Sequence, residues 1–160
     1  MTARVNGRAK GRAFEQSIAR DLRAWLGDGW TVTRTPTDQQ RDQAQRGQAG
    51  EFTVVGPGRF TWALECKAHK DFDLRQLWRR PIDGPLPGWW RQATGQAAKV
   101  GARPMLVVKV ARGETLCIVP GTAHAAGPYF DFVLGDENLT AVRWADAAGL
   151  VRRGIALEPR

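Results

Sequence analysis

Glu51, Glu65 and Lys67 are the residues whose types and spacing could carry chemistry in this 160-residue chain. Residues 51–55 and 60–66 have the composition of β-strands, and the Gly-Pro-Gly sequence between them is typical of a hairpin turn. Because side chains alternate along a strand, Glu65 and Lys67 project from the same face. A three-residue turn that pairs Gly56 with Phe60 also places Glu51 opposite Glu65. The pattern therefore predicts two carboxylates and a lysine on one patch of sheet.

This set of side chains suits phosphodiester hydrolysis. Two close carboxylates repel each other unless a cation lies between them, and a hard divalent ion such as Mg²⁺ suits their oxygens. The lysine can hold or deprotonate a water, or stabilise charge on a phosphate during in-line attack. The alternative is an exposed ion pair of Glu65 and Lys67, which would contribute very little. We disfavour it because apolar residues at 60, 62, 64 and 66 assign the opposite face to the core.

The first half of the chain supplies the elements that position this patch. Apolar residues at 14, 18, 22 and 25 recur at helical spacing, which predicts a helix over 13–26 that ends at the glycines at 27 and 29. Residues 30–34 alternate as a short strand. Residues 37–50 are polar and rich in glutamine, so we expect a long loop that is functional or mobile.

The second half predicts an irregular excursion over 68–88 and a helix over 89–100. Strands follow at 104–110, 114–119, 129–134 and 141–144, with a short helical piece over 146–153. The predicted fold class is α/β (α+β), with a central mixed β-sheet flanked by helices. We divide the chain into a basic flexible arm (1–12), a core (13–120) and a C-terminal extension packed on the same domain (121–160).

Composition indicates a basic single domain. The chain has 24 Lys+Arg against 16 Asp+Glu, a net charge of +8, which favours a polyanionic partner, nucleic acid above all. Only Cys66 and Cys117 are present, so we exclude a disulfide framework and a zinc cage and expect both in the core. No apolar run suits a membrane span or a signal peptide, and we expect a cytoplasmic protein in a bacterial, archaeal or phage-infected cell.

The spacing Glu51-x13-Glu65-Cys-Lys67 resembles the core of PD-(D/E)xK nucleases, with Glu15 matching the acidic residue that many members carry on the preceding helix. A closer resemblance is to Holliday-junction resolvases of the archaeal Hjc type. It covers roughly residues 8 to 120 and rests on residues 10–15, 34–37, 64–67 and 99–109. The resemblance implies a restriction-endonuclease-like fold in which residues 13–120 form the nuclease core. It also implies a dimeric, Mg²⁺-dependent endonuclease, with Mn²⁺ as a substitute, that nicks opposing strands of a four-way DNA junction.

The resemblance also implies roles for individual residues. Glu15 would bind or orient the metal, Glu51 and Glu65 would be direct ligands, and Lys67 would assist the attacking water. Thr37 stands near a hydroxyl residue that reaches towards the scissile phosphate. Related nucleases often have a glutamine on the helix after the lysine strand; this matches Gln92, with Gln96 one turn further on as its competitor.

Two departures from the family pattern are visible. Gly50-Glu51 stands where the family has Pro-Asp, so Asp38 and Asp42 in the long loop are rivals for the first ligand position. Residues beyond 120 have no counterpart in the family. They could form a dimer element, a DNA clamp or extra core.

Several basic and aromatic residues are candidates for DNA contact. Trp89 and Trp90 could stack on DNA bases, or one of them could lie in the core and the other at the surface. We expect His69 to be exposed and to contact a phosphate rather than to act in catalysis. The residues that we assign to DNA binding are Arg4, Arg8, Lys10, Arg12 and Arg34. The first four of these could instead form a solvated tail. Further positive charge, without assigned contacts, comes from Arg75, Arg79, Arg80, Arg91 and Lys99.

Two other functions remain open. One is a sequence-specific or nicking restriction-type nuclease of the same superfamily, which would need residues 37–48 as a base-reading loop. The other is a non-catalytic DNA-binding scaffold.

Overall fold

The core of the protein is a five-stranded mixed sheet. The computed structural model describes residues 7–36, 39, 44, 47–69, 72, 73, 75, 77, 83–110, 113–121 and 129–156, without the side chains of residues 7 and 8. The strand order is β4-β5-β6-β8-β7, in which only the β4–β5 pair is parallel. The strands are β4 (Trp62–Ala68), β5 (Arg103–Lys109), β6 (Thr115–Pro120), β7 (Tyr129–Leu134) and β8 (Glu137–Arg143).

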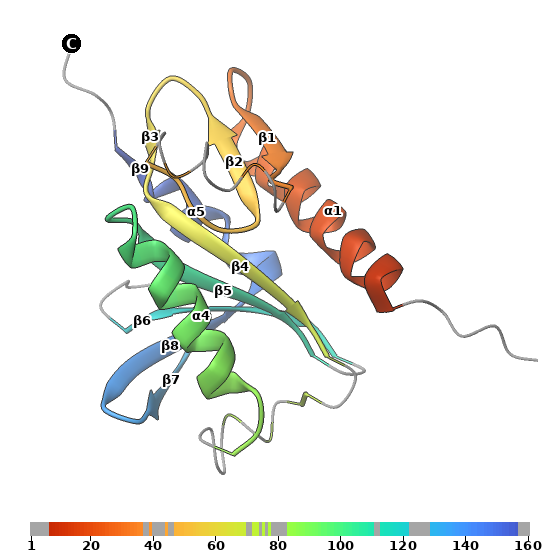
Figure 1. Ribbon diagram of the computed structural model, residues 1–160, viewed down its shortest axis with the longest axis vertical. Coiled ribbons are helices and arrows are strands. Elements are labelled where there is room, and N and C mark those ends of the chain that lie inside the picture. The colour runs from red at the N-terminus through yellow and green to blue at the C-terminus, as the bar shows by residue number, and fades with distance from the viewer. Residues whose placement is uncertain are drawn as a thin grey trace, which may run out of the picture.

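Helices cover both faces of this sheet (Figure 1). On one face α1 (Gly7–Leu26) and α5 (Ala148–Arg152) pack against alternate residues of β4 and β5, in a cluster that includes Ile18, Leu64 and Val151. On the other face α4 (Leu86–Ala98) packs through Leu86, Trp90 and Ala93. The predicted mixed sheet flanked by helices is confirmed.

Helix α1 begins earlier than the sequence pattern predicted. It starts at Gly7 rather than at residue 13, so residues 7–12 of the predicted flexible arm are helical. Alanine, lysine and arginine are good helix formers, and extending a helix that is already nucleated costs little per residue. The end of the helix is where the glycines predicted it: Gly27 has φ +82° and its N–H donates to the Arg23 carbonyl at 3.0 Å.

The predicted hairpin between residues 51–55 and 60–66 is wrong. β2 (Phe52–Val55) pairs antiparallel with β1 (Thr31–Arg34), and β3 (Arg59–Phe60) pairs with β9 (Ile155–Ala156). Glu51 is therefore not a cross-strand partner of Glu65, nor Gly56 of Phe60. The reason is tertiary: β2 buries Phe52 and Val54 in the core that α1 covers, together with Val32 of β1.

The C-terminal segment is part of the central sheet. β8 lies between β6 and β7, and a 3₁₀ turn, η2 (Trp144–Asp146), leads into α5. Trp144 is buried, its ring centroid lies 4.6 Å from that of Trp25, and its Nε1 donates to Asp21 Oδ2 at 2.9 Å. No helix in the described parts of the chain is long and apolar enough to cross a membrane.

These contacts make Trp144 a test of how the C-terminal segment contributes to stability. Truncating a buried tryptophan removes its packing and leaves a cavity, so Trp144→Ala should lower the free energy of unfolding by about 3–5 kcal/mol. Tyr129→Ala, at a side chain that is 57% exposed, should stay within about 0.5 kcal/mol of wild type in the same urea titration. Equal effects of the two substitutions would contradict this account.

Candidate active site

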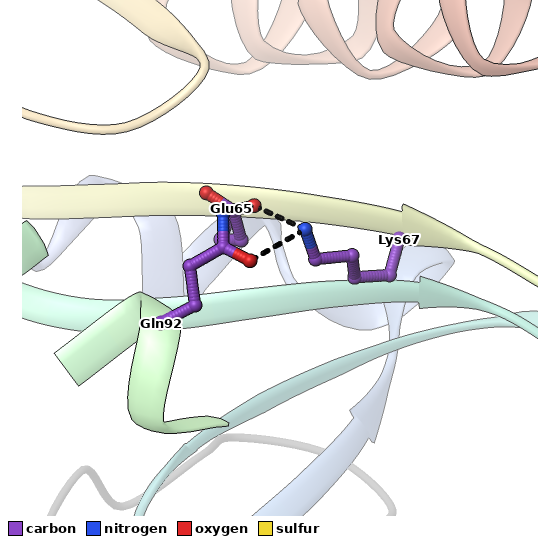
Figure 2. A network of polar contacts seen from close by, with 3 residues as sticks. All are labelled: Glu65, Lys67 and Gln92. Atoms are coloured by element: carbon purple, nitrogen blue, oxygen red, sulfur yellow. Dashed lines mark hydrogen bonds and ion pairs between the residues drawn. The ribbon is translucent and has the colours of Figure 1, made fainter. Parts of the chain in front are cut away.

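Glu65 lies in the middle of β4 and is only 2% exposed. A buried carboxylate is costly unless hydrogen bonds compensate for its lost hydration. Two side chains provide them: Lys67 Nζ lies 2.6 Å and Gln92 Nε2 2.7 Å from Glu65 Oε1. Lys67 Nζ also donates to Gln92 Oε1 at 2.9 Å, which closes a three-residue network (Figure 2).

The network joins two elements of the fold. Glu65 and Lys67 are two residues apart on β4 and share the face that α4 covers. Gln92 enters from α4, which is held on that face by buried Trp90 and Ala93. The sequence left Gln92 and Gln96 as alternatives, and the structure places Gln92 in contact with the other two.

The second carboxylate oxygen of Glu65 has a different environment. Both donors reach Oε1, and among the described residues no donor reaches Oε2. Figure 2 shows this oxygen on the side of the carboxylate that faces away from Lys67. A buried carboxylate oxygen without a donor is suited to a cation or to a proton that a substrate or water brings.

Glu51 lies beside β4 through its backbone. Its N–H donates to the Leu64 carbonyl at 2.8 Å, and its own carbonyl accepts from the Thr35 N–H at 2.9 Å. The pKa of the Glu51 carboxyl is raised to about 7, mainly by burial and then by the negative charges of Glu65 and Glu15, which outweigh the opposite effect of Lys67 and Arg34. The three predicted carboxylates therefore influence one another electrostatically.

Gly50 makes this approach possible. It forms a parallel bridge with Leu64 and has φ +100°, and an added Cβ would lie 2.2 Å from the Leu64 carbonyl oxygen. Proline, with φ near −65°, could not adopt this conformation. The close approach to Leu64 therefore explains why Gly50, rather than proline, precedes the acidic residue. In the sequence, the glycine directly before Glu51 was the only indication of this contact.

Glu15 has another partner. It forms a hydrogen-bonded ion pair with Arg34, at the end of β1, and this bond raises the pKa of Arg34. In the described part of the chain, no three acidic, histidine or cysteine side chains are arranged to hold a metal ion. The structure thus brings Glu65, Lys67 and Gln92 into contact, with Glu51 nearby, and pairs Glu15 with Arg34.

Sequence reasoning missed two residues that support Glu51. Thr35 is buried, and its Oγ1 lies 2.8 Å from Thr53 Oγ1, so it ties β1 to β2 next to Glu51. The Gln48 side chain bonds both backbone groups of Val54, at 2.6 and 2.9 Å. It thereby holds the end of the glutamine-rich segment against β2. Thr35 lies within the 34–37 segment that carries the family resemblance but was given no role, and Gln48 had no sequence signal beyond its polarity.

The remaining candidates are dispersed. Lys10 and Arg12 are exposed near the start of α1, and Arg75, Arg91 and Lys99 are exposed elsewhere. Trp90 is buried and Trp89 is partly buried against Phe72, so the two tryptophans divide between core and surface, and Cys66 and Cys117 are buried as predicted. Outside the described residues lie Arg4, Thr37, Asp38, Asp42, Arg79, Arg80, His124 and the side chain of Arg8.

Comparisons with known proteins gave two matches. A family model described as phage putative PDDEXK endonuclease matches residues 6–130. The solved structure of Hjc, a Holliday junction resolvase from the archaeal hyperthermophile Archaeoglobus fulgidus, is similar at 13% identity and a TM-score of 0.46. That alignment covers 89% of this chain and 98% of the Hjc chain. No curated protein matched.

The raised pKa of Glu51 predicts a pH-dependent stability. Its carboxyl binds a proton more tightly in the folded protein (pKa about 7) than at its ordinary value of 4.5. The free energy of unfolding should therefore fall as pH rises between these values. Glu51→Gln removes this loss and should stabilise the protein by ~1–2 kcal/mol at pH 8, after discounting for solvent screening, but not at pH 4.

Urea titrations at the two pH values measure this difference. The same substitution at exposed Glu114 reports the general effect of removing one negative charge from a basic protein. A Glu51→Gln effect that is the same at pH 4 and pH 8 would contradict the assignment.

Gly50→Ala should be destabilising by about 2 kcal/mol or more, because it combines a positive φ with a backbone clash. Gly27→Ala is the matched control: its φ is +82° with no atom within 4 Å of an added Cβ, so it carries the backbone strain alone. Thermal unfolding of both variants compares them. If Gly27→Ala were as destabilising as Gly50→Ala, the close approach to Leu64 would not matter.

Proposed function

Because the chain belongs to the family of phage putative PDDEXK endonucleases, we propose that it is a structure-selective DNA endonuclease that makes paired, Mg²⁺-dependent nicks in four-way DNA junctions. The observation that supports the catalytic part is the buried Glu65 carboxylate. One of its oxygens accepts hydrogen bonds from Lys67 and Gln92, and no donor among the described residues reaches the other. The junction part rests on the resemblance of residues 10–15, 34–37, 64–67 and 99–109 to archaeal resolvases.

The proposal includes a homodimer. A four-way junction has two-fold symmetry, and a symmetric pair of subunits offers two active sites in matching positions. Such an enzyme recognises shape and phosphates rather than bases.

Glu65 and Glu51 would hold the metal ion. Mg²⁺ in nucleotide chemistry is often bound by one or two carboxylates, with water and substrate phosphate oxygens as its other ligands. Glu65 Oε2, which no donor among the described residues reaches, and the carboxyl of Glu51, whose pKa is raised by burial and by neighbouring negative charges, fit this requirement. Mn²⁺ should substitute for Mg²⁺. The bound ion would polarise the phosphate and lower the pKa of the attacking water.

The other side chains have distinct roles in this proposal. The Lys67 ammonium group, beside Glu65 Oε1, is placed to donate to the attacking water or to a phosphate oxygen as negative charge develops. Gln92 is a positioning residue, because it orients both Glu65 and Lys67. Glu15 orients Arg34, and Arg34, Lys10 and Arg12 contact the DNA backbone together with Arg4 and Arg8. Thr37 approaches the scissile phosphate.

Cleavage of a labelled, immobile four-way junction tests the proposal, with linear duplex of the same sequence as competitor, in Mg²⁺ and in EDTA. Paired nicks across the junction should require Mg²⁺. Glu65→Ala should lower the cleavage rate by about 10³-fold or more, because both the ligand and the anchor of Lys67 are lost, while junction binding persists. Glu114→Ala, at an exposed glutamate away from the site, should cleave like wild type.

The positioning role of Gln92 has a control on its own helix. Gln92→Ala should slow cleavage by roughly 10–100-fold, the usual cost of losing a residue that orients a ligand, whereas Gln96→Ala should not. Sequence-specific cutting of the duplex would overturn junction selectivity in favour of a restriction-type nuclease. Tight binding without cutting in any divalent ion would leave only a DNA-binding scaffold.

A further inference from the structure

A second group of basic side chains lies where β4 and β5 begin. It consists of Arg59 on β3, Arg103 at the start of β5 and Arg153 directly after α5; we call it the arginine cluster. In Figure 1, β3, β9 and α5 lie together at this end of the fold. None of the three arginines belongs to the candidate active site.

Thr61 brings these segments together. Its carbonyl accepts from the Arg103 N–H at 2.8 Å, and its N–H and Oγ1 donate to the Gly154 carbonyl at 2.7 and 2.8 Å. Thr61 thus bonds both Arg103 and Gly154, the residue that follows Arg153. Arg59 reaches the same end of the fold, because its Nη2 donates to the Val100 carbonyl at 3.4 Å.

Arg103 is held in place by stacking. Its Cζ lies 3.7 Å from the ring centroid of buried Trp62, a cation–π contact that restricts the guanidinium. Burial lowers the pKa of Arg103, and the nearby positive charge of Arg153 lowers it further. Neither Arg59 nor Arg103 forms an ion pair with an acidic residue in the described part of the chain. An anion would relieve the repulsion within this group.

We propose that Arg103 and Arg153, flanked by Arg59, bind a phosphate of the DNA backbone other than the scissile one. Arginine suits this ligand because its planar guanidinium can donate two parallel hydrogen bonds to phosphate oxygens. Trp62 precedes Glu65 by three residues on β4 and points to the opposite face, so this contact is separate from catalysis. The choice of DNA rests on the proposed function.

Salt dependence of DNA binding tests the proposal. Binding of the four-way junction and of linear duplex is measured in EDTA, where cleavage does not interfere. The double variant Arg103→Gln, Arg153→Gln should reduce the slope of log K against log salt by roughly 0.9 per lost phosphate contact. Affinity near 0.1 M salt should fall by about tenfold or more.

The matched control removes two positive charges elsewhere. Arg20 and Arg143 each lie within 4.0 Å of a carboxylate, at 3.8 Å from Asp21 and 2.6 Å from Asp146. The double variant Arg20→Gln, Arg143→Gln should therefore change the slope much less. Equal slopes for the two double variants would overturn the proposal, because only net charge would then matter.

A further variant separates binding from folding. Arg103→Lys keeps the positive charge and loses the planar stack on Trp62. This variant should lower thermal stability while keeping most of the slope of log K against log salt. If Arg103→Lys instead lowered both the thermal stability and the salt slope, Arg103 would have a structural role only. If the double variant lowers the salt slope as expected but the wild-type protein does not nick the junction, the proposed activity is refuted and the proposed phosphate contact of the arginine cluster is still supported.

Discussion

The rest of the active site depends on the cost of burying the Glu65 carboxylate. At 2% exposure this group cannot be hydrated, so donors must come from the protein. Lys67 is placed by the two-residue period of β4, and Gln92 by the packing of α4 on the same face. Both donors converge on one oxygen, which leaves the other available to a metal ion. A single electrostatic requirement thus explains the orientation of three side chains from two elements.

The position of Glu51 follows from backbone contacts. β2 is a partner of β1, and only the bridge at Gly50 joins this pair of strands to β4 among the described residues. The absence of a Cβ at Gly50 allows the chain to touch Leu64, and this contact brings the Glu51 carboxyl into the field of Glu65 and Glu15. Burial of this carboxyl, together with repulsion from Glu65 and Glu15, destabilises the folded protein at neutral pH. A divalent ion bound by the carboxylates would offset both effects, so instability and metal affinity have the same origin.

The arginine cluster and the network of Glu65, Lys67 and Gln92 lie on different parts of the fold. Arg34 is neutralised by Glu15, whereas Arg59 and Arg103 have no acidic partner among the described residues and are anchored through backbone contacts near Thr61. The C-terminal segment supplies Arg153 and also completes the sheet and its core through β8 and Trp144. It therefore links the stability of the fold to the arginine cluster, which we assign to the DNA backbone.

The sequence by itself predicted most of the main-sheet strands, the existence of the two long helices and the grouping of Glu65 with Lys67, because alternation and helical spacing are local properties of the chain. It missed the first half of β8, which begins at Glu137, and the first turns of α1, which begins at Gly7. The family resemblance also restricted the glutamine expected beside Glu65 and Lys67 to two candidates on one helix, Gln92 and Gln96. The sequence could not decide strand partners: the glycine-rich turn predicted a hairpin, but Phe52 and Val54 gain more by packing under α1 beside Val32, and Thr61 bonds to Gly154. Pairing of Glu15 with Arg34 and the choice of Gln92 were likewise decided by tertiary structure, since each depends on contacts between residues distant in the chain.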